Sequence, residues 1–201
     1  ITSEADALLA VALGADAIGF IFAPSPRQIA PLAAADIVKR LPPEIVTLGV
    51  FRDETSQRVL EIVHAAHLHG AQLHGHESTE TAFEVANGVR FSVKAVVAGS
   101  HSARVGDTYG VDALLVDGPN PGSGEAYDWE LLNEIPSSMR FILAGGLTPD
   151  TVSQAIMMAR PWGVDVSSGV EKSLGVKDAV KMRHFIANAR SAASMLGDND
   201  L

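Results

Sequence analysis

The sequence of 201 residues contains no cysteine. It can therefore form no disulfide and no thiolate metal site, which fits a reducing compartment. No apolar run approaches the ~18 residues that a membrane span needs, and no basic segment precedes an apolar run as in a signal peptide. These absences make the cytoplasm the expected location and argue against a membrane partner.

Basic clusters are absent as well. The formal net charge is −9 at pH 7, and the lysine and arginine residues form no run. Nucleic acid is therefore not expected as a partner, because nucleic-acid binders carry a basic patch or stripe. The remaining composition, 47% hydrophobic and 19% charged, is that of one compact domain with a substantial core.

Seven short apolar runs rich in β-branched residues recur along the chain, and each predicts a buried parallel strand. The runs cover residues 17–22, 46–51, 71–73, 91–96, 113–116, 141–144 and 164–166. Segments with helical spacing lie between them, without a linker or a break in composition. This alternation predicts a single α/β domain over residues 1–190, followed by a frayed tail over residues 191–201.

Helix starts are predicted from capping residues. Thr2 is expected to cap a helix over residues 3–13, and Asp53 is expected to precede another. Thr148, which stands before a proline, predicts a third start. The last helix is expected from Asp178 onward. Its predicted buried residues are Val180, Phe185, Ile186 and Ala189.

The chain opens with a helix, whereas a βα barrel opens with a strand. A parallel barrel of seven strands would leave strand edges unpaired, which folded proteins avoid. We therefore expect an α/β protein of the (β/α)8 TIM-barrel class, with the first strand absent from these residues and preceding Ile1 in the natural protein. A seven-stranded open or doubly wound sheet is the rival interpretation.

In a parallel barrel, ligand-binding groups come from the carboxyl ends of the strands and the loops after them. Arg27 closes a stiff Pro-Ser-Pro-Arg loop, and its guanidinium suits two-point capture of a carboxylate or phosphate. Gln72 and His74 alternate onto one side of their strand, so both are expected to bind substrate at the barrel mouth. The plainer alternatives are a surface arginine and a structural, hydrogen-bonded histidine.

Two aspartates stand at strand ends. Asp117 directly follows four apolar residues, and partial desolvation would raise the pKa of its carboxyl and suit it to general-acid catalysis. A helix-capping or loop-ordering aspartate is the alternative. Asp165 lies between two valines, so it is expected to point into the lumen and to bind substrate, because a buried carboxylate needs a partner or a purpose.

Two glycine-containing loops follow the last two predicted strands. Gly145 and Gly146 form one loop, and Ser167, Ser168 and Gly169 form the other. Glycines there let backbone N–H groups approach a phosphate, and two such loops on adjacent strands predict a phosphate site. No metal site is expected, because the neighbouring histidines have no carboxylate or cysteine at ligand spacing. These histidines are His64, His67, His69 and His76.

Taken in order along the chain, a set of motifs resembles the phosphoribosylanthranilate isomerase family. The motifs are GFIF at 19–22, SPR at 25–27, GVF at 49–51, QLHG at 72–75, GSG at 122–124 with DW at 128–129, LAGGL at 143–147 and VDVSSGVE at 164–171. The resemblance extends from Ile1 to about residue 189 at the expected spacing, so as a set the motifs are highly specific.

The resemblance implies a cofactor-free Amadori rearrangement in tryptophan biosynthesis. The substrate would be N-(5-phosphoribosyl)anthranilate, and the product 1-(2-carboxyphenylamino)-1-deoxyribulose 5-phosphate. By the same resemblance, Asp117 is the general acid that protonates the furanose ring oxygen. Arg27 would hold the anthranilate carboxylate, and the two glycine-containing loops would hold the phosphate.

In this family the general base is a cysteine in a Lys-x-Cys-Gly-Ile-Thr motif at the end of the first strand, where it removes the proton from ribose C2. This sequence begins with Ile1 and Thr2, the last two letters of that motif. The resemblance therefore implies Cys-Gly immediately before Ile1 in the natural protein. The 201 residues alone are expected not to catalyse at a normal rate.

Two other functions stay open at this point. A bifunctional barrel would also isomerise the histidine-pathway substrate, which needs a second phosphate site that the Arg27 loop does not offer. A non-catalytic phosphosugar-binding barrel would follow if the natural chain began at Ile1. The expected ligand is a small phosphosugar in each case. A monomer, a homodimer, and a fusion or association with the next tryptophan-pathway enzyme all fit the composition.

Overall fold

The computed structural model describes residues 1–118 and 129–197 of the chain. Seven strands form one parallel sheet, in which each strand pairs with the next along the chain. The strands are β1 (Ala17–Ile21), β2 (Val46–Phe51), β3 (Gly70–Leu73), β4 (Phe91–Val97), β5 (Ala113–Asp117), β6 (Arg140–Leu143) and β7 (Gly163–Val164). The seven predicted strands are confirmed in order, although β1 and β7 are each one residue shorter than expected.

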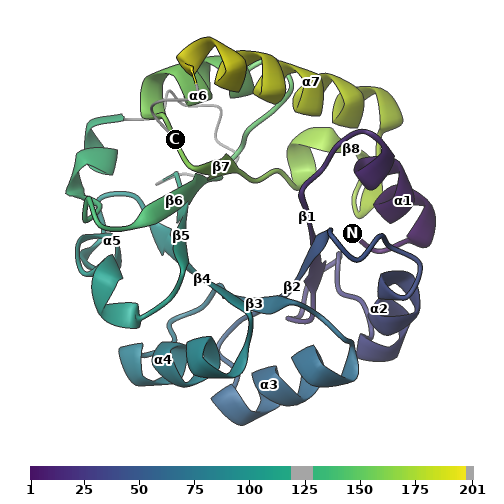
Figure 1. The fold of residues 1–201 in the computed structure, drawn as a ribbon, viewed down its shortest axis with the longest axis vertical. Coiled ribbons are helices and arrows are strands. Elements are labelled where there is room, and N and C mark those ends of the chain that lie inside the picture. Colours follow the sequence, from purple (N-terminus) through teal and green to yellow (C-terminus); the bar gives the residue numbers. More distant parts are fainter. Residues whose placement is uncertain (119–128, 198–201) are drawn as a thin grey trace.

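The sheet curves into a ring, and the helices cover its outer surface (Figure 1). The helices are α1 (Glu4–Ala12), α2 (Pro31–Val38), α3 (Ser56–Ala65), α4 (Thr79–Gly88), α5 (His101–Arg104), α6 (Val152–Ala159) and α7 (Ala179–Leu196). Three 3-10 turns are η1 (Gly106–Tyr109), η2 (Trp129–Glu134) and η3 (Ser168–Val170). Because strand order follows chain order without a switch point, the doubly wound alternative is excluded, and the chain has an α/β fold with a curved parallel sheet.

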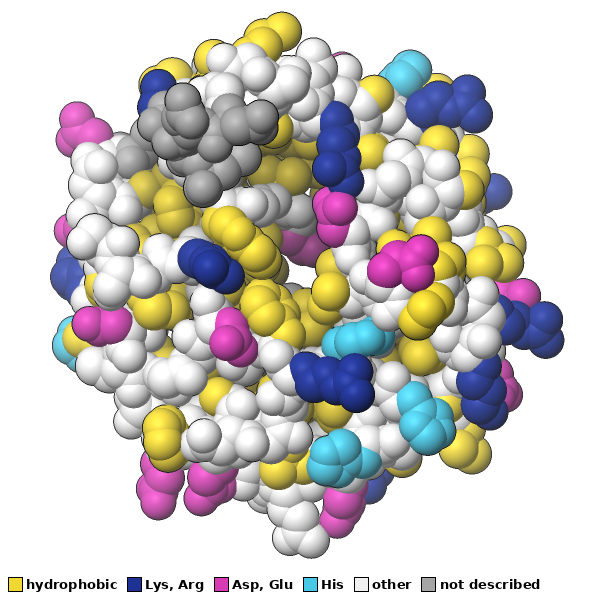
Figure 2. Space-filling view, in the orientation of Figure 1, with side chains coloured by type: hydrophobic (Ala, Val, Ile, Leu, Met, Phe, Trp, Pro, Cys, Tyr) yellow, Lys and Arg dark blue, Asp and Glu magenta, His cyan; other side chains and the backbone are white. Residues whose placement is uncertain are grey.

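Side chains of the strands alternate between two apolar layers, as a strand period of two requires. One cluster contains strand residues and the residue that follows β6, and it packs inside the ring: Leu48, Val93, Ala95, Leu115 and Ala144. Strand residues of the other parity pack with the helices in the larger outer cluster. Figure 2 shows hydrophobic side chains around a hollow at the centre of the face. Polar residues that continue the inward parity at the carboxyl ends of the strands therefore stand at the mouth of the ring at that end.

The cap predicted for α1 is wrong, whereas the helix expected after Asp53 is present. Ser3, not Thr2, caps α1, since the Ser3 hydroxyl accepts a backbone N–H of the first turn. α3 follows Asp53 as predicted, and Thr55 caps it in the same way. Asp53 has a left-handed backbone with φ 55°, and its carboxylate accepts the N–H of His76 instead. Several capping residues stand close together at these points, and tertiary contacts decide which of them caps the helix.

The last two helices confirm one predicted start and correct two other predictions. α6 begins at Val152, later than predicted, because the Thr148 N–H first closes a turn onto the Thr151 hydroxyl (3.0 Å). α7 begins directly after Asp178, next to its predicted start, and Asp178 caps it by accepting two backbone N–H groups of the first turn at 2.9 and 3.0 Å. Val180, in that first turn, is 58% exposed, so its predicted burial is wrong. Of the other residues expected on that face, Phe185 is buried and Ile186 and Ala189 are partly buried.

The predicted tail begins too early. α7 continues to Leu196, and Ala192 within it is buried. Residues 191–196 are therefore packed helix, because Ala192 extends the apolar stripe by which α7 lies against the ring. Gly197, with φ 79°, follows the last helical residue, and residues 198–201 lie outside the described part of the chain.

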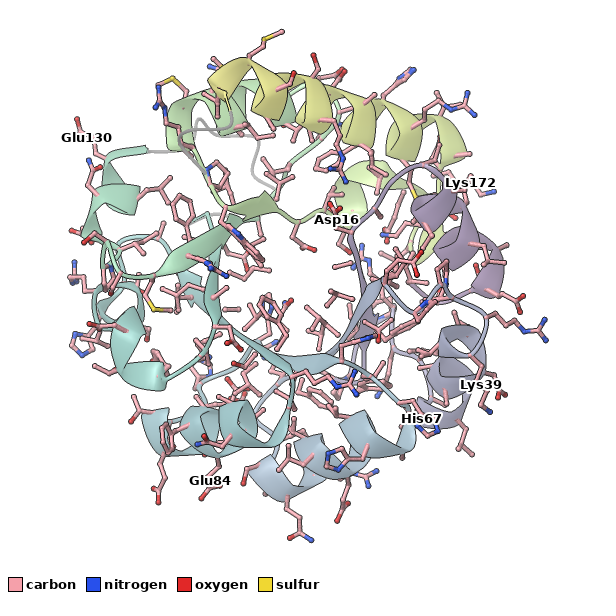
Figure 3. All side chains as sticks on the ribbon, viewed as in Figure 1. Asp16, Lys39, His67, Glu84, Glu130 and Lys172 are labelled. Atoms are coloured by element: carbon pink, nitrogen blue, oxygen red, sulfur yellow. The ribbon has the colours of Figure 1, made fainter. Side chains whose placement is uncertain are left out.

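The ring is open on one side. Within the described residues β1 and β7 do not pair with each other. A small antiparallel hairpin follows β7 and is formed by β8 (Glu171–Ser173) and β9 (Val176–Lys177). Near this opening, Arg190 of α7 pairs with Asp16, the residue before β1, at 2.7 Å (Figure 3). The segments on either side of the opening are thus joined by side chains rather than by a strand ladder.

Candidate active site

Asp117 is the last residue of β5, and it continues the inward parity of Leu115, which packs inside the ring. Its Oδ2 lies 3.1 Å from Nε2 of His74. Gln72 Nε2 lies 2.9 Å from the other ring nitrogen, Nδ1. The structure thus brings together three of the residues singled out from the sequence. They form a chain of contacts in which Gln72 meets His74 and His74 meets Asp117.

These contacts orient the His74 ring. An amide NH2 group can only donate, so Nδ1 of His74 accepts from Gln72 and Nε2 carries the proton. Nε2–H then donates to Oδ2 of Asp117, which leaves the second carboxyl oxygen, Oδ1, available to a ligand. The imidazole is therefore a donor that orients the carboxyl group.

A buried ion pair, missed by the sequence analysis, holds the loop after β3. Glu77 accepts hydrogen bonds from the N–H groups of Gly75 (3.0 Å) and Asp53 (2.9 Å). Lys94 Nζ donates to Glu77 Oε2 and to the Gly75 carbonyl, both at 2.7 Å. Burial acts to raise the pKa of Glu77, but the hydrogen bonds from Lys94 and the backbone outweigh it and the pKa is lowered. The signal in the sequence was a lysine inside the apolar run 91–97.

A cavity of about 430 Å³ lies beside this loop and reaches Asp117. Its volume is within the range of roughly 300–1,000 Å³ in which proteins bind small organic molecules. Residues that line it include Arg52, His74, Lys94, Val97, Tyr109 and Asp117. The carboxyl group of Asp117 therefore borders a space that can hold a small molecule.

The two glycine-containing loops lie together at the end of β5. Gly145 and Gly146 have left-handed backbones, with φ 83° and 72°. A Cβ on Gly145 would stand 2.5 Å from the backbone nitrogen of Gly118, so only glycine lets the loop approach β5 this closely. A Cβ on Gly169 would stand 1.8 Å from the carbonyl oxygen of Leu147, which joins the second loop to the first. Both predicted phosphate loops therefore border the same corner of the mouth.

The second loop presents polar groups to this corner. Ser167 and Ser168, which precede Gly169, are both exposed. The Ser167 carbonyl is held from behind by Lys177 Nζ at 2.8 Å. The loop is thus fixed by its carbonyl, while its hydroxyl groups stay accessible.

Asp165 points into the ring, as predicted, because Val164 and Val166 on either side of it pack in the outer layer. Its N–H donates to Leu143 O (2.9 Å) and extends the ladder beyond β7. The side chain reaches solvent through the open centre, yet the protein around it displaces enough water to raise the pKa of its carboxyl. The charge of Asp117 raises this pKa further.

Arg27 is fixed by an ion pair rather than projecting freely from its loop. Its Nε and Nη2 donate to the two carboxylate oxygens of Glu171 at 2.7 and 2.8 Å. The hydrogen bonds from Arg27 are the main cause that lowers the pKa of Glu171 to about 2, and the charge of Lys177 adds to them. The pKa of Arg27 is raised by the same pair. Arg27 therefore does not match the surface arginine that was the plainer interpretation.

Some predictions fall outside what the structure describes. The loop of Gly122, Ser123 and Gly124 with Asp128 lies in the undescribed segment, as does the side chain of Trp129. Within residues 1–118 and 129–197, no three His, Asp or Glu side chains group as a metal site. Over the same residues, no helix is long and apolar enough to cross a membrane.

Comparisons with known proteins agree with one another. Residues 1–188 match the family model described as N-(5'phosphoribosyl)anthranilate (PRA) isomerase. The N-(5'-phosphoribosyl)anthranilate isomerase of Desulforudis audaxviator is 45% identical over 200 residues, which cover 96% of each chain. The crystal structure of phosphoribosyl anthranilate isomerase from Thermus thermophilus has a TM-score of 0.86 at 41% identity, covering 95% of this chain and 96% of that one. A phosphoribosyl anthranilate isomerase in complex with reduced 1-(o-carboxyphenylamino)-1-deoxyribulose 5-phosphate has a TM-score of 0.82 at 35% identity, covering 95% of both chains.

Proposed function

This chain belongs to the N-(5'-phosphoribosyl)anthranilate isomerase family, and we propose that it converts N-(5'-phosphoribosyl)anthranilate into 1-(2-carboxyphenylamino)-1-deoxyribulose 5-phosphate in tryptophan biosynthesis. The reaction opens a furanose ring, moves a proton from ribose C2 and yields a ketose. It needs an acid, a base and sites for a carboxylate and a phosphate. The observation that carries the proposal is Asp117, held by His74 at an inward strand end beside the loop of Gly145, which the second glycine-containing loop adjoins.

Asp117 supplies the acid. His74 Nε2–H occupies Oδ2, so the proton that opens the sugar is carried on Oδ1 and passes to the furanose ring oxygen. As the bond from ribose C1 to that oxygen breaks, the lone pair of the anthranilate nitrogen forms the Schiff base. Gln72 holds His74 in the donating state. From the sequence, Gln72 and His74 were expected to bind the substrate directly. This geometry instead favours a role in which they orient the carboxyl group of Asp117.

The anionic ends of the substrate meet separate groups. Arg27 binds the anthranilate carboxylate, since a guanidinium pairs with a carboxylate through two parallel hydrogen bonds. The phosphate binds at Gly145 and Gly146 and at the loop over residues 167–169, where left-handed glycines and exposed hydroxyl groups converge. Asp165, inside the ring between these groups, accepts a hydrogen bond from a ribose hydroxyl.

The base is a cysteine on an eighth strand that fills the open side of the ring and completes a (β/α)8 barrel. Gly19 O faces that open side, because Asp16 and Phe22, of the other parity, make the hydrogen bonds to β2. The backbone nitrogen of Ile1 donates to Gly19 O at 2.9 Å. A strand leading into Ile1 would thus continue a parallel ladder along β1. Its last residues would bring the Cys-Gly expected from the family motif to the mouth of the ring.

The natural gene product provides the test. An intact-mass spectrum shows whether a segment precedes Ile1, and an assay with N-(5'-phosphoribosyl)anthranilate shows turnover. We expect additional mass that accounts for a strand with a cysteine, and turnover that stops when that cysteine is changed to serine. A natural chain that begins at Ile1 and binds the substrate without turnover would favour the phosphosugar-binding barrel instead. Turnover of the histidine-pathway substrate as well would favour the bifunctional enzyme.

A further inference from the structure

Glu171 joins segments that are far apart in the chain. It is the first residue of β8, and its carboxylate accepts both Nε and Nη2 of Arg27, which lies 144 residues earlier in the loop after β1. The Glu171 side chain is only 6% exposed. The ion pair therefore ties the loop after β1 to the segment after β7, across the open side of the ring.

The same carboxylate also reaches the proposed phosphate loop. Lys177 faces Glu171 across the β8–β9 hairpin, and its Nζ lies 3.3 Å from Glu171 Oε1. That Nζ also donates to the carbonyl of Ser167 at 2.8 Å. Lys181 holds the backbone carbonyl of Glu171 at 2.8 Å, which fixes the start of β8. Glu171 thus contacts one cation that holds Ser167 and another, Arg27, that is proposed to hold a carboxylate.

The way in which Arg27 is paired leaves it able to bind a second carboxylate. A guanidinium offers two edges for two-point hydrogen bonding, one through Nε and Nη2 and one through Nη1 and Nη2. Glu171 occupies the first edge. No other group in residues 1–118 or 129–197 bonds to Nη1 of Arg27 in the structure. Glu171 therefore orients the guanidinium without covering its outer edge, and the side-chain entropy of the arginine is lost on folding rather than on binding.

We propose that Glu171 is a positioning residue that couples the recognition of the two anionic ends of the substrate. Through its ion pair it holds the outer edge of Arg27 toward the anthranilate carboxylate, and through Lys177 it holds the Ser167 loop in place for the phosphate. This inference rests on the proposed function, because it takes from it which group binds at each end. The occupant is thus a phosphosugar that carries an aryl carboxylate.

Calorimetric binding to the full natural gene product tests the coupling with three ligands. The first is the product, 1-(2-carboxyphenylamino)-1-deoxyribulose 5-phosphate. The second is the 1-phenylamino compound, which lacks the carboxylate, and the third is inorganic phosphate. The ratio of the Kd values for the first two ligands measures carboxylate selectivity, and the third reports on the phosphate loop alone. Because no turnover is required, a change in the acid or the base does not enter the result.

Glu171→Gln removes the charge with little change in shape. We expect carboxylate selectivity to fall on the order of tenfold, the effect of losing one charge-assisted contact, and the Kd for inorganic phosphate to rise. Glu171→Asp keeps the charge, but its shorter side chain cannot reach both Arg27 and Lys177. It should therefore shift the carboxylate selectivity and the Kd for inorganic phosphate in the same direction as Glu171→Gln, but by less. This variant also covers the case in which Glu171→Gln does not fold. Lys172→Gln is the matched control. Lys172 is the next residue on β8, is exposed and lies at the outer edge of the ring (Figure 3), so both values should stay as in the wild type.

The remaining outcomes separate this inference from the proposed function. Arg27→Lys should lower carboxylate selectivity whatever Glu171 does. If Arg27→Lys lowers it and both Glu171 variants leave selectivity and phosphate binding unchanged, the coupling role is overturned and the proposed function stands. If Arg27→Lys leaves selectivity unchanged, the assignment of the carboxylate to Arg27 is wrong, and the coupling falls with it. A wild-type protein that does not turn over N-(5'-phosphoribosyl)anthranilate contradicts the proposed function itself.

Discussion

The two sides of the ring mouth are held together by different kinds of contact. On the side of β3 and β5, hydrogen bonds join Gln72, His74 and Asp117 in a chain. On the side of β1 and β7, Arg27 and Glu171 form a two-point ion pair that a lysine extends toward the phosphate loop. These sides lie across the ring from each other (Figure 1).

The two kinds of contact suit two different tasks, proton transfer and anion binding. An acid has to change its charge during the reaction, and hydrogen-bond donors orient its carboxyl group for that step. Binding sites for anions benefit from charges that are in place beforehand, because nothing then has to reorganise when the ligand arrives. Substitutions on the β3–β5 side should therefore lower kcat, and those on the β1–β7 side should raise KM. The following experiments test this division.

The largest effect is expected for Asp117→Asn. The amide has the same shape but no proton to give to the ring oxygen, so kcat should fall by roughly 10²–10⁴-fold, the usual range for general-acid assistance, with KM little changed. Steady-state kinetics of the natural gene product measure both constants, and Asp107→Asn on the exposed surface of η1 serves as the control. Near-normal turnover with Asn at this position would remove Asp117 from the mechanism.

Asp117 could be identified before the structure because its signal is local. A lone carboxyl residue after four apolar residues marks the end of a buried strand, and the same period of two placed Gln72, His74 and Asp165 on the inner side. Strand order followed from the regular alternation of strands and helices. Glycines after the last two strands were equally visible, although only their φ values and close contacts show how the loops meet.

Contacts between distant segments could not be predicted. Glu171 and Arg27 lie 144 residues apart, and Glu77 and Lys94 pair across 17 residues through the curvature of the sheet. No periodicity encodes such pairs, because each depends on how far the ring has curved and which loops stand next to each other. The cap predicted for α1 failed for a related reason, since Thr2 and Ser3 are adjacent and a contact of the Thr2 hydroxyl with the distant Gly175 carbonyl leaves Ser3 as the cap.

The second largest effect concerns stability on the β3–β5 side. Lys94→Met leaves the carboxylate of Glu77 buried without its cation, and such a change costs about 3–5 kcal/mol of unfolding free energy. Chemical denaturation of the variant measures this loss. The double variant Lys94→Met, Glu77→Leu should recover much of it, because no unpaired charge remains. A loss below about 1 kcal/mol in the single variant would show that water or a rearranged loop replaces the lysine.

A slightly smaller effect on stability is expected when the pH is lowered, and it concerns the Arg27–Glu171 ion pair on the β1–β7 side. The pKa of Glu171 is lowered from 4.5 to about 2, so its ion pair contributes stability that is complete above pH ~5 and is lost as the pH falls toward 2. A shift of this size corresponds to roughly 3 kcal/mol. The difference in unfolding free energy between the wild type and Glu171→Gln should therefore shrink between pH 5 and pH 2. A difference that is independent of pH would mean that the carboxylate charge does not stabilise the fold.

The smallest effect, and the one that divides the two sides most sharply, is expected for Gln72→Leu. Without the amide, Nδ1 of His74 has no donor, and the ring can take the tautomer in which Nε2 no longer donates to Asp117. Since one neutral hydrogen bond contributes about 1 kcal/mol, kcat should fall about fivefold, with KM unchanged. Gln57→Leu, on the exposed face of α3, is the matched control. A rise in KM with kcat unchanged would instead show that Gln72 contacts the substrate directly. The β3–β5 side would then share substrate binding with Arg27 rather than serve proton transfer alone.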